Sequence, residues 1–317
     1  MLRSLPIQPL LDLLDEGLRI YRRGFVRFLT ISALGLVPLA IGLGLVIASG
    51  AYYSAGPLLL GLLLWLPLSI LVVVVAAGAM SRSAIALRDE QPLGLWAALR
   101  FGPGRAVGMS CFGIIFLIVV NIASSIVSCI CLLPFYAVLL SSAIGAGGLF
   151  DSGGLGVVLA ALFGVLAVVA VILFYGLSLV LGGATYCSFV YGLQPFAQEQ
   201  LGVGAAMGYS LDMLFYRFGR NLLAFLLTSL AFAAMAGVVT IAAAVLIPLP
   251  LSLALGADSP VAQVAGGTAW LFGLAAALPL LPIWMALFYR DNADRRSGAD
   301  LAERIATMAA PAEGGNV

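Results

Sequence analysis

Side chains that could do chemistry are scarce in this sequence, and the clearest group lies in an apolar stretch near residue 125. Asn121, Ser125 and Ser128 follow at steps of four and three residues, which places them on one face of a helix. Tyr175, in the next apolar stretch, is a candidate partner. Such a face could contact a polar ligand, or it could form hydrogen bonds between membrane helices. We favour packing, in which each such bond contributes about 0.6 kcal/mol.

Catalytic chemistry is restricted by the residue types that the sequence lacks. There is no histidine, and all 15 basic residues are arginine. Histidine is the usual base near neutral pH and a frequent metal and haem ligand, so most hydrolase, zinc and haem sites are excluded. The four cysteines lie in apolar stretches, where packing is their usual role. The sequence predicts no enzyme activity, no cofactor, no metal and no nucleic-acid partner.

The composition is that of a membrane protein. Of 317 residues, 63% are hydrophobic and 9% are charged, and the mean hydropathy is +1.15; soluble domains carry about 25% charged residues. Charge-free stretches long enough for spans of about 20 residues recur along the chain. They predict an all-α polytopic integral membrane helix bundle with six transmembrane helices, near residues 28–50, 57–80, 106–133, 156–188, 221–250 and 262–288. Eight spans stay open, because 106–150 and 152–198 are each long enough to fold back.

The arginines alternate from one side of these spans to the other. They occur before the first span, after every second span and after the last, whereas the three intervening loops carry none. Arginine is retained on the cytoplasmic side of a membrane. We therefore expect a multi-pass protein of the cytoplasmic (inner) membrane with both termini in the cytoplasm. Residues 291–317 would then form a cytoplasmic tail that is partly disordered.

Residues 1–27 contain a strongly amphipathic segment. Apolar residues recur at helical spacing from Ile7 to Phe25, with acidic and arginine residues on the other face. This pattern predicts a helix that lies in the cytoplasmic interface of the membrane. Arginines near the membrane are expected to contact anionic lipid head groups. The candidates for this contact are Arg19, Arg22, Arg23, Arg100 and Arg217.

Three short motifs indicate internal repetition. Residues 21–24 (YRRG), 99–102 (LRFG) and 216–219 (YRFG) each precede an odd-numbered span. We interpret the transmembrane domain, residues 28–290 with its flanks, as three parallel repeats of an interfacial helix and two spans. Their bounds are about 8–90, 91–197 and 204–293. Chance similarity between apolar sequences is the competing explanation.

A stripe of small residues runs along the last predicted span. Ala265, Ala269, Gly273 and Ala277 recur every four residues and would let another helix approach closely. The neighbouring helix could belong to the same chain or to another subunit, and we favour packing within the chain.

One segment resembles a known family. Residues 14–25 (LDEGLRIYRRGF), which lead into a proline-containing span, resemble the membrane domain found beside some bacterial glycerophosphodiester phosphodiesterases and stand-alone six-span proteins of that kind. Residues 288–301 resemble a weakened form of the aromatic, arginine-rich exit segment of such proteins. The phosphodiesterase chemistry of the family lies in a separate soluble barrel that uses histidine, so it does not carry over. The resemblance implies a membrane module that supports or localises other components.

Two functions are compatible with these patterns. The first is a non-catalytic integral membrane scaffold or accessory subunit of a membrane protein complex. It fits the lack of ionisable residues in the predicted spans, the interfacial helices and the small-residue stripe. The alternative is a permease-type protein for an uncharged or lipid-like substrate, which fits the polar face around Asn121, the prolines of the odd spans and the parallel repeats. The partners expected are anionic membrane lipids and a membrane protein of unknown identity.

Overall fold

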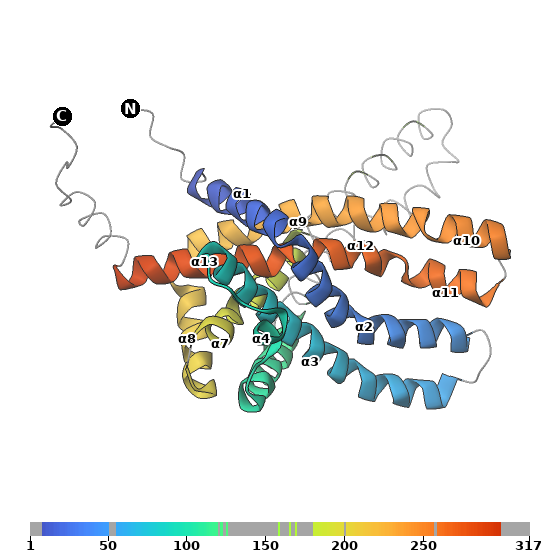
Figure 1. The fold of residues 1–317 in the computed structure, drawn as a ribbon, viewed down its shortest axis with the longest axis horizontal. Coiled ribbons are helices and arrows are strands. Elements are labelled where there is room, and N and C mark those ends of the chain that lie inside the picture. Colours follow the sequence, from blue (N-terminus) through green and yellow to red (C-terminus); the bar gives the residue numbers. More distant parts are fainter. Residues whose placement is uncertain are drawn as a thin grey trace.

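The computed structural model is helical throughout the part of the chain that it describes (Figure 1). This part consists of residues 8–50, 55–119, 180–199, 201–256 and 259–298, with residues 121, 122, 125, 158, 165 and 169. The all-α prediction is confirmed there. Part of the third predicted span and most of the fourth lie outside the described residues, so six spans remain a prediction.

Four helical stretches of the described chain are long and apolar enough to cross a membrane, which indicates a multi-pass membrane protein. They are Phe25–Ile47, Pro67–Arg88, Phe218–Leu255 and Pro260–Ser297. The first two belong to single long helices, and the other two are interrupted. The helices are α2 (Phe25–Gly50), α3 (Ala55–Arg88), α9 (Phe218–Leu246), α10 (Pro248–Leu255), α11 (Pro260–Thr268), α12 (Trp270–Ala277) and α13 (Leu280–Ser297).

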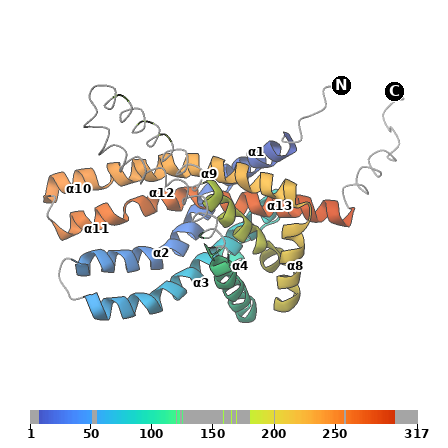
Figure 2. The same ribbon diagram turned by 180° about the vertical axis from the view of Figure 1, so that it is seen from behind.

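Short helices lie towards one end of this bundle. They are α1 (Gln8–Arg23), α4 (Leu95–Leu99), α7 (Gln194–Gln198) and α8 (Val203–Phe215). The C-terminal ends of α3 and α13 lie in the same half of the molecule, whereas α10 and the C-terminal end of α2 lie in the other half (Figures 1 and 2). We call the half that contains α1, α4, α7 and α8 the arginine-rich end.

Each of the three short motifs lies where a short helix meets a longer one. We call residues 21–24 the first joint, because Gly24 separates α1 from α2. Residues 99–102 are the middle joint, between α4 and the helix Pro103–Val119, and residues 216–219 are the third joint, between α8 and α9. At the third joint Arg217 has a φ of 50°, a left-handed conformation that turns the chain. The three motifs thus share a position at the junction of two helices, while the repetition of whole units stays a prediction.

The amphipathic helix predicted near the start of the chain is α1, and its apolar face packs on α13. The Trp284 indole donates a hydrogen bond to the Leu14 carbonyl at 2.9 Å, and the Tyr21 hydroxyl donates to the Ala276 carbonyl at 2.6 Å. Gly17 lies beneath Trp284, where a Cβ atom would be 2.7 Å from the indole nitrogen. Burial raises the pKa of the Tyr21 phenol, so this hydroxyl stays a donor. The buried residues of α1 are Leu10, Leu14, Gly17 and Ile20.

This contact changes the interpretation of the segment. An apolar helix face can pack equally well on lipid or on another helix. In the structure it packs on α13, and most charged residues of α1 are exposed, namely Asp12, Asp15, Arg19, Arg22 and Arg23. The predicted interfacial helix therefore meets its surroundings through its charged side chains.

We expect Trp284→Phe to loosen α1 from α13. The substitution removes the bond to Leu14, which costs about 1 kcal/mol, so the amides of α1 should exchange hydrogen about fivefold faster. Trp270→Phe is the matched control, because the Trp270 indole bonds only to Gly267 of its own turn, at 2.9 Å. Unchanged exchange in α1 of the Trp284 variant would show that this bond does not hold the helix.

Candidate functional site: a polar network at the arginine-rich end

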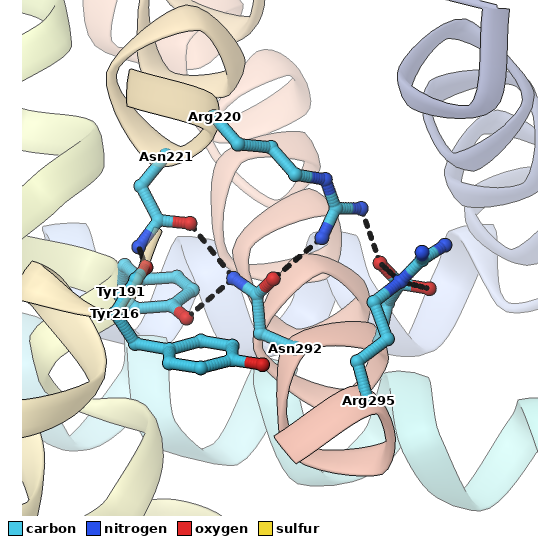
Figure 3. A network of polar contacts seen from close by, with 7 residues as sticks. Tyr191, Tyr216, Arg220, Asn221, Asn292 and Arg295 are labelled. Atoms are coloured by element: carbon cyan, nitrogen blue, oxygen red, sulfur yellow. Dashed lines mark hydrogen bonds and ion pairs between the residues drawn. The ribbon is translucent and has the colours of Figure 1, made fainter. Parts of the chain in front are cut away.

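A buried asparagine lies at the centre of a polar network at the arginine-rich end (Figure 3). Asn292 in α13 is 2% exposed. Its amide nitrogen donates to Tyr191 Oη and to Asn221 Oδ1, each at 2.8 Å. Its carbonyl oxygen accepts a bond from Arg220 Nη1 at 2.6 Å. Three of the four hydrogen bonds that this amide can form go to neighbouring helices, so Asn292 links α13 to α9 and to the helix 180–192.

Asn221 extends the network to α8. Its amide nitrogen donates to the carbonyl oxygens of Met213, Leu214 and Tyr216, at 3.0, 3.1 and 2.8 Å. The last carbonyls of a helix have no partners within the helix. Asn221 supplies a donor to them at the C-terminal end of α8 and so fixes the third joint.

An acidic residue forms ion pairs with two arginines beside the asparagines. Asp291 pairs with Arg220 of α9 and with Arg295 one turn later in α13, whose Nε lies 3.0 Å from Oδ2. All three side chains are partly buried. Charge-assisted bonds in this setting are stronger than exposed ones, and removing one member leaves an unbalanced charge.

Aromatic residues cover the other side of the network. The ring of Tyr191 lies edge-on to Phe225 and to Tyr289, with centroids 5.4 and 5.9 Å apart. The Tyr289 hydroxyl donates to Glu199 Oε1 at 3.2 Å, at the end of α7. The network thereby joins α13 to α8, to α9, to the helix 180–192 and to the end of α7.

A second cluster ties α3 to α7. The Gln194 amide donates to Ser81 Oγ at 3.1 Å and to the Val190 carbonyl at 2.8 Å, and Gln198 donates to Gln194 Oε1 at 2.9 Å. Arg82 Nε donates to the Ala197 carbonyl at 2.8 Å. These bonds hold α7 against the C-terminal half of α3.

The hydrogen bonds of both clusters join residues of the protein itself. Over the described residues, no group of three or more Cys, Asp or Glu side chains could hold a metal ion. What these residues do in the structure is fix helices at the arginine-rich end.

The polar face predicted around residue 125 is described only in part. Asn121 and Ser125 are helical and exposed, and the Asn121 amide donates to the Leu117 carbonyl at 2.7 Å. Ser128 and Tyr175 lie outside the described residues. A ligand contact at this face stays a prediction.

The small-residue stripe lies in α11 and α12, and its glycine contacts α9. A Cβ atom on Gly273 would lie 2.5 Å from the Val239 carbonyl oxygen and 2.6 Å from Thr240 Cα. Ala269 and Ala277 are buried, and Ala265 is partly buried. Gly273 thus permits close packing of two helices within the chain.

The arginines predicted to contact lipid differ in their surroundings. Arg19 is paired with Asp15 at 2.5 Å, and the guanidinium of Arg217 lies 5.6 Å from the Tyr216 ring centroid. Arg22, Arg23 and Arg100 are exposed and form no salt bridge to the described residues. These three are accessible to an anion from outside the chain.

The network itself was not predicted. Asn221 follows Arg220 at the start of one apolar stretch, and Asn292 follows Asp291 just after the end of another. Such positions usually face water. A signal was present in the polarity of Gln194, Asn221 and Asn292 beside apolar runs, but their spacing along the chain is irregular. Only the packing of the helices brings them together.

Comparison of the chain with protein-family models, with curated proteins and with solved structures found no match. The resemblance of residues 14–25 to a bacterial membrane domain therefore stays a prediction.

Proposed function

We propose that this protein is a non-catalytic membrane scaffold or accessory subunit, which holds a partner membrane protein at the cytoplasmic face of the inner membrane. The observation that carries this proposal is the position of α1. Its hydrogen bonds to α12 and α13 hold it in one orientation, with Asp12, Asp15 and Arg19 exposed. A fixed helix with an exposed face is a preorganised binding surface, so little conformational entropy would be lost from α1 when a partner binds.

The charges on this face suit a specific partner. The Asp15–Arg19 pair is exposed on both sides, and such pairs contribute little to stability. A partner could therefore take over either charge at small cost. Complementary charges select between partners and speed association. Leu11, 50% exposed on the same helix, adds an apolar contact.

The polar network supports the non-catalytic part of the proposal. Asn292, Asn221 and Arg220 form bonds to the protein itself, as a rigid platform requires. A permease for an uncharged or lipid-like substrate is the alternative. It is favoured by the exposure of Asn121 and Ser125 on one side of a membrane helix.

We expect Asp12→Arg with Asp15→Arg to release the partner. The wild-type chain, extracted with its native lipid, should carry one membrane protein in a fixed ratio by mass spectrometry. Reversing two charges on the α1 face should reduce its recovery at least tenfold, because like charges across an interface repel. The control is Asp89→Arg with Glu90→Arg, an equal charge change in the exposed turn after α3.

Equal loss in both variants would show that net charge, not α1, holds the partner. A wild-type chain recovered alone would contradict the scaffold function. If that chain carried a tightly bound lipid or small molecule, the permease would be the better account.

A further inference from the structure

The three joints differ in whether a carboxylate pairs with an arginine near them. Glu16 of α1 pairs with Arg88 at 3.0 Å near the first joint, and Asp212 pairs with Arg296 at 2.9 Å near the third. The third joint also has the Asp291 carboxylate between two arginines. The middle joint is different. Three arginines surround it, and none of them forms a salt bridge within the part of the chain that the structure describes. They are Arg82, Arg100 and Arg105.

Neutral groups hold Arg82 in position. Its guanidinium carbon lies 4.2 Å from the centroid of the Phe101 ring. Its Nε donates to the Ala197 carbonyl at 2.8 Å, and its Nη1 donates to the Arg100 carbonyl at 3.2 Å. A guanidinium has five N–H groups, and these bonds use two of them. Arg82 is thus a partly buried cation, fixed in place but not neutralised, and such a charge is unfavourable without an anion.

The carboxylates that lie close to these residues or their partners in the sequence do not fill this role. Glu199, two residues beyond Ala197, accepts a bond from Tyr289. Asp89 and Glu90, in the turn between α3 and α4, are exposed and form no salt bridge with the described residues. An anion that balances the middle joint therefore has to come from outside the described chain.

Apolar side chains beside the arginines indicate which anion this is. Trp96 on α4 is 78% exposed, and Val107 on the following helix is 55% exposed. Exposed tryptophan beside arginine is typical of the level of lipid head groups in membrane proteins. A phospholipid offers a phosphate to the arginines and acyl chains to the apolar residues, whereas a soluble phosphate offers only the first.

We propose that the middle joint binds the phosphate of one anionic phospholipid through Arg82, Arg100 and Arg105, with its acyl chains beside Trp96 and Val107. This site is independent of the scaffold function, because it lies apart from the exposed face of α1. The lipid phosphate takes the place of the carboxylates that pair with Arg88 and Arg296 near the other two joints.

The test uses the full chain, purified in detergent and stripped of lipid. Titration with short-chain phosphatidylglycerol, followed by native mass spectrometry, should show one bound lipid and a higher melting temperature. Phosphatidylcholine, which has no net charge, should bind at least tenfold more weakly. Arg100→Gln with Arg105→Gln should weaken the binding of phosphatidylglycerol at least tenfold. Arg22→Gln with Arg23→Gln removes two exposed charges from the first joint and should change binding less than twofold.

Three results would overturn the proposal. Equal weakening by both double variants would show general attraction to positive charge. Equal binding of the two lipids would show that the anionic charge is not recognised. Displacement of phosphatidylglycerol by millimolar inorganic phosphate, without the rise in melting temperature, would assign the site to a soluble anion. Arg82→Gln is a further test: a folded variant that keeps wild-type affinity would remove Arg82 from the site.

Discussion

Gly273→Leu is expected to prevent α12 from packing on α9. The first side-chain atom would lie 2.5 Å from the Val239 carbonyl oxygen and 2.8 Å from the Thr240 nitrogen. These are backbone atoms of a helix, and they cannot move aside as a flexible side chain can. Overpacking of a core costs about 1–3 kcal/mol, and we expect the upper end of that range or more. The measurement is the melting temperature of the purified protein, together with the fraction that elutes as a single species.

Gly237→Ala in α9 is the control for this substitution. A Cβ atom at Gly237 would meet nothing within 4 Å. Alanine is favoured over glycine inside a helix by about 0.5–1 kcal/mol, so the control should melt at the wild-type temperature or above. A Gly273→Leu protein that melts like this control would show that α12 and α9 do not pack closely.

Asn292→Leu is expected to lower the free energy of unfolding by about 3 kcal/mol, since it leaves several buried polar groups without partners. The Asn221 carbonyl oxygen and Arg220 both lose a bond, and the Tyr191 hydroxyl loses its donor. Leucine is close to asparagine in size, so the effect reports the hydrogen bonds more than a cavity. Denaturant unfolding in detergent measures it.

A double-mutant cycle with Asn221→Leu separates the network from general damage. Two residues of one network should show a coupling energy of about 1 kcal/mol or more, whereas the stability changes caused by substitutions at independent sites simply add. Ser297→Ala, an exposed position whose hydroxyl bonds only to Asp294 of its own turn, should have no measurable effect. If the losses of unfolding free energy in the Asn221→Leu and Asn292→Leu variants simply add, the hydrogen bond between these residues contributes nothing to stability.

The spans were predictable because hydrophobic length is a local property of the chain. The predicted span 28–50 corresponds to α2, and 57–80 to α3. Both α3 and α13 continue past the apolar stretch, to Arg88 and Ser297. A charge ends a hydrophobic run but does not end a helix, so the ends at the arginine-rich end were predicted too early.

Interruptions within spans were less visible. The predicted helix 262–288 consists of α11, α12 and α13, with turns at Ala269 and at Leu278–Pro279. Proline has no N–H to donate, which explains the second turn but not the first. The structure offers no single residue that accounts for the turn at Ala269.

The polar network depends on tertiary structure and could not be read from spacing. Asn292 bonds to residues 71 and 101 positions away. The same limit applies to α1, whose periodic apolar face identified a helix but not what covers it. For Gly273 the sequence predicted close approach, and only the fold shows that the neighbour is α9.

The two hydrogen bonds of α1 have a mechanical consequence. They lie on opposite sides of the turn between α12 and α13. Tyr21 bonds to Ala276, which precedes the turn, and Leu14 accepts a bond from Trp284, which follows it. Helix α1 therefore bridges the turn between α12 and α13. A change in the angle between these two helices must break one of the two bonds or move α1 as well. Binding of a protein to the exposed face of α1 would therefore be coupled to the angle between α12 and α13.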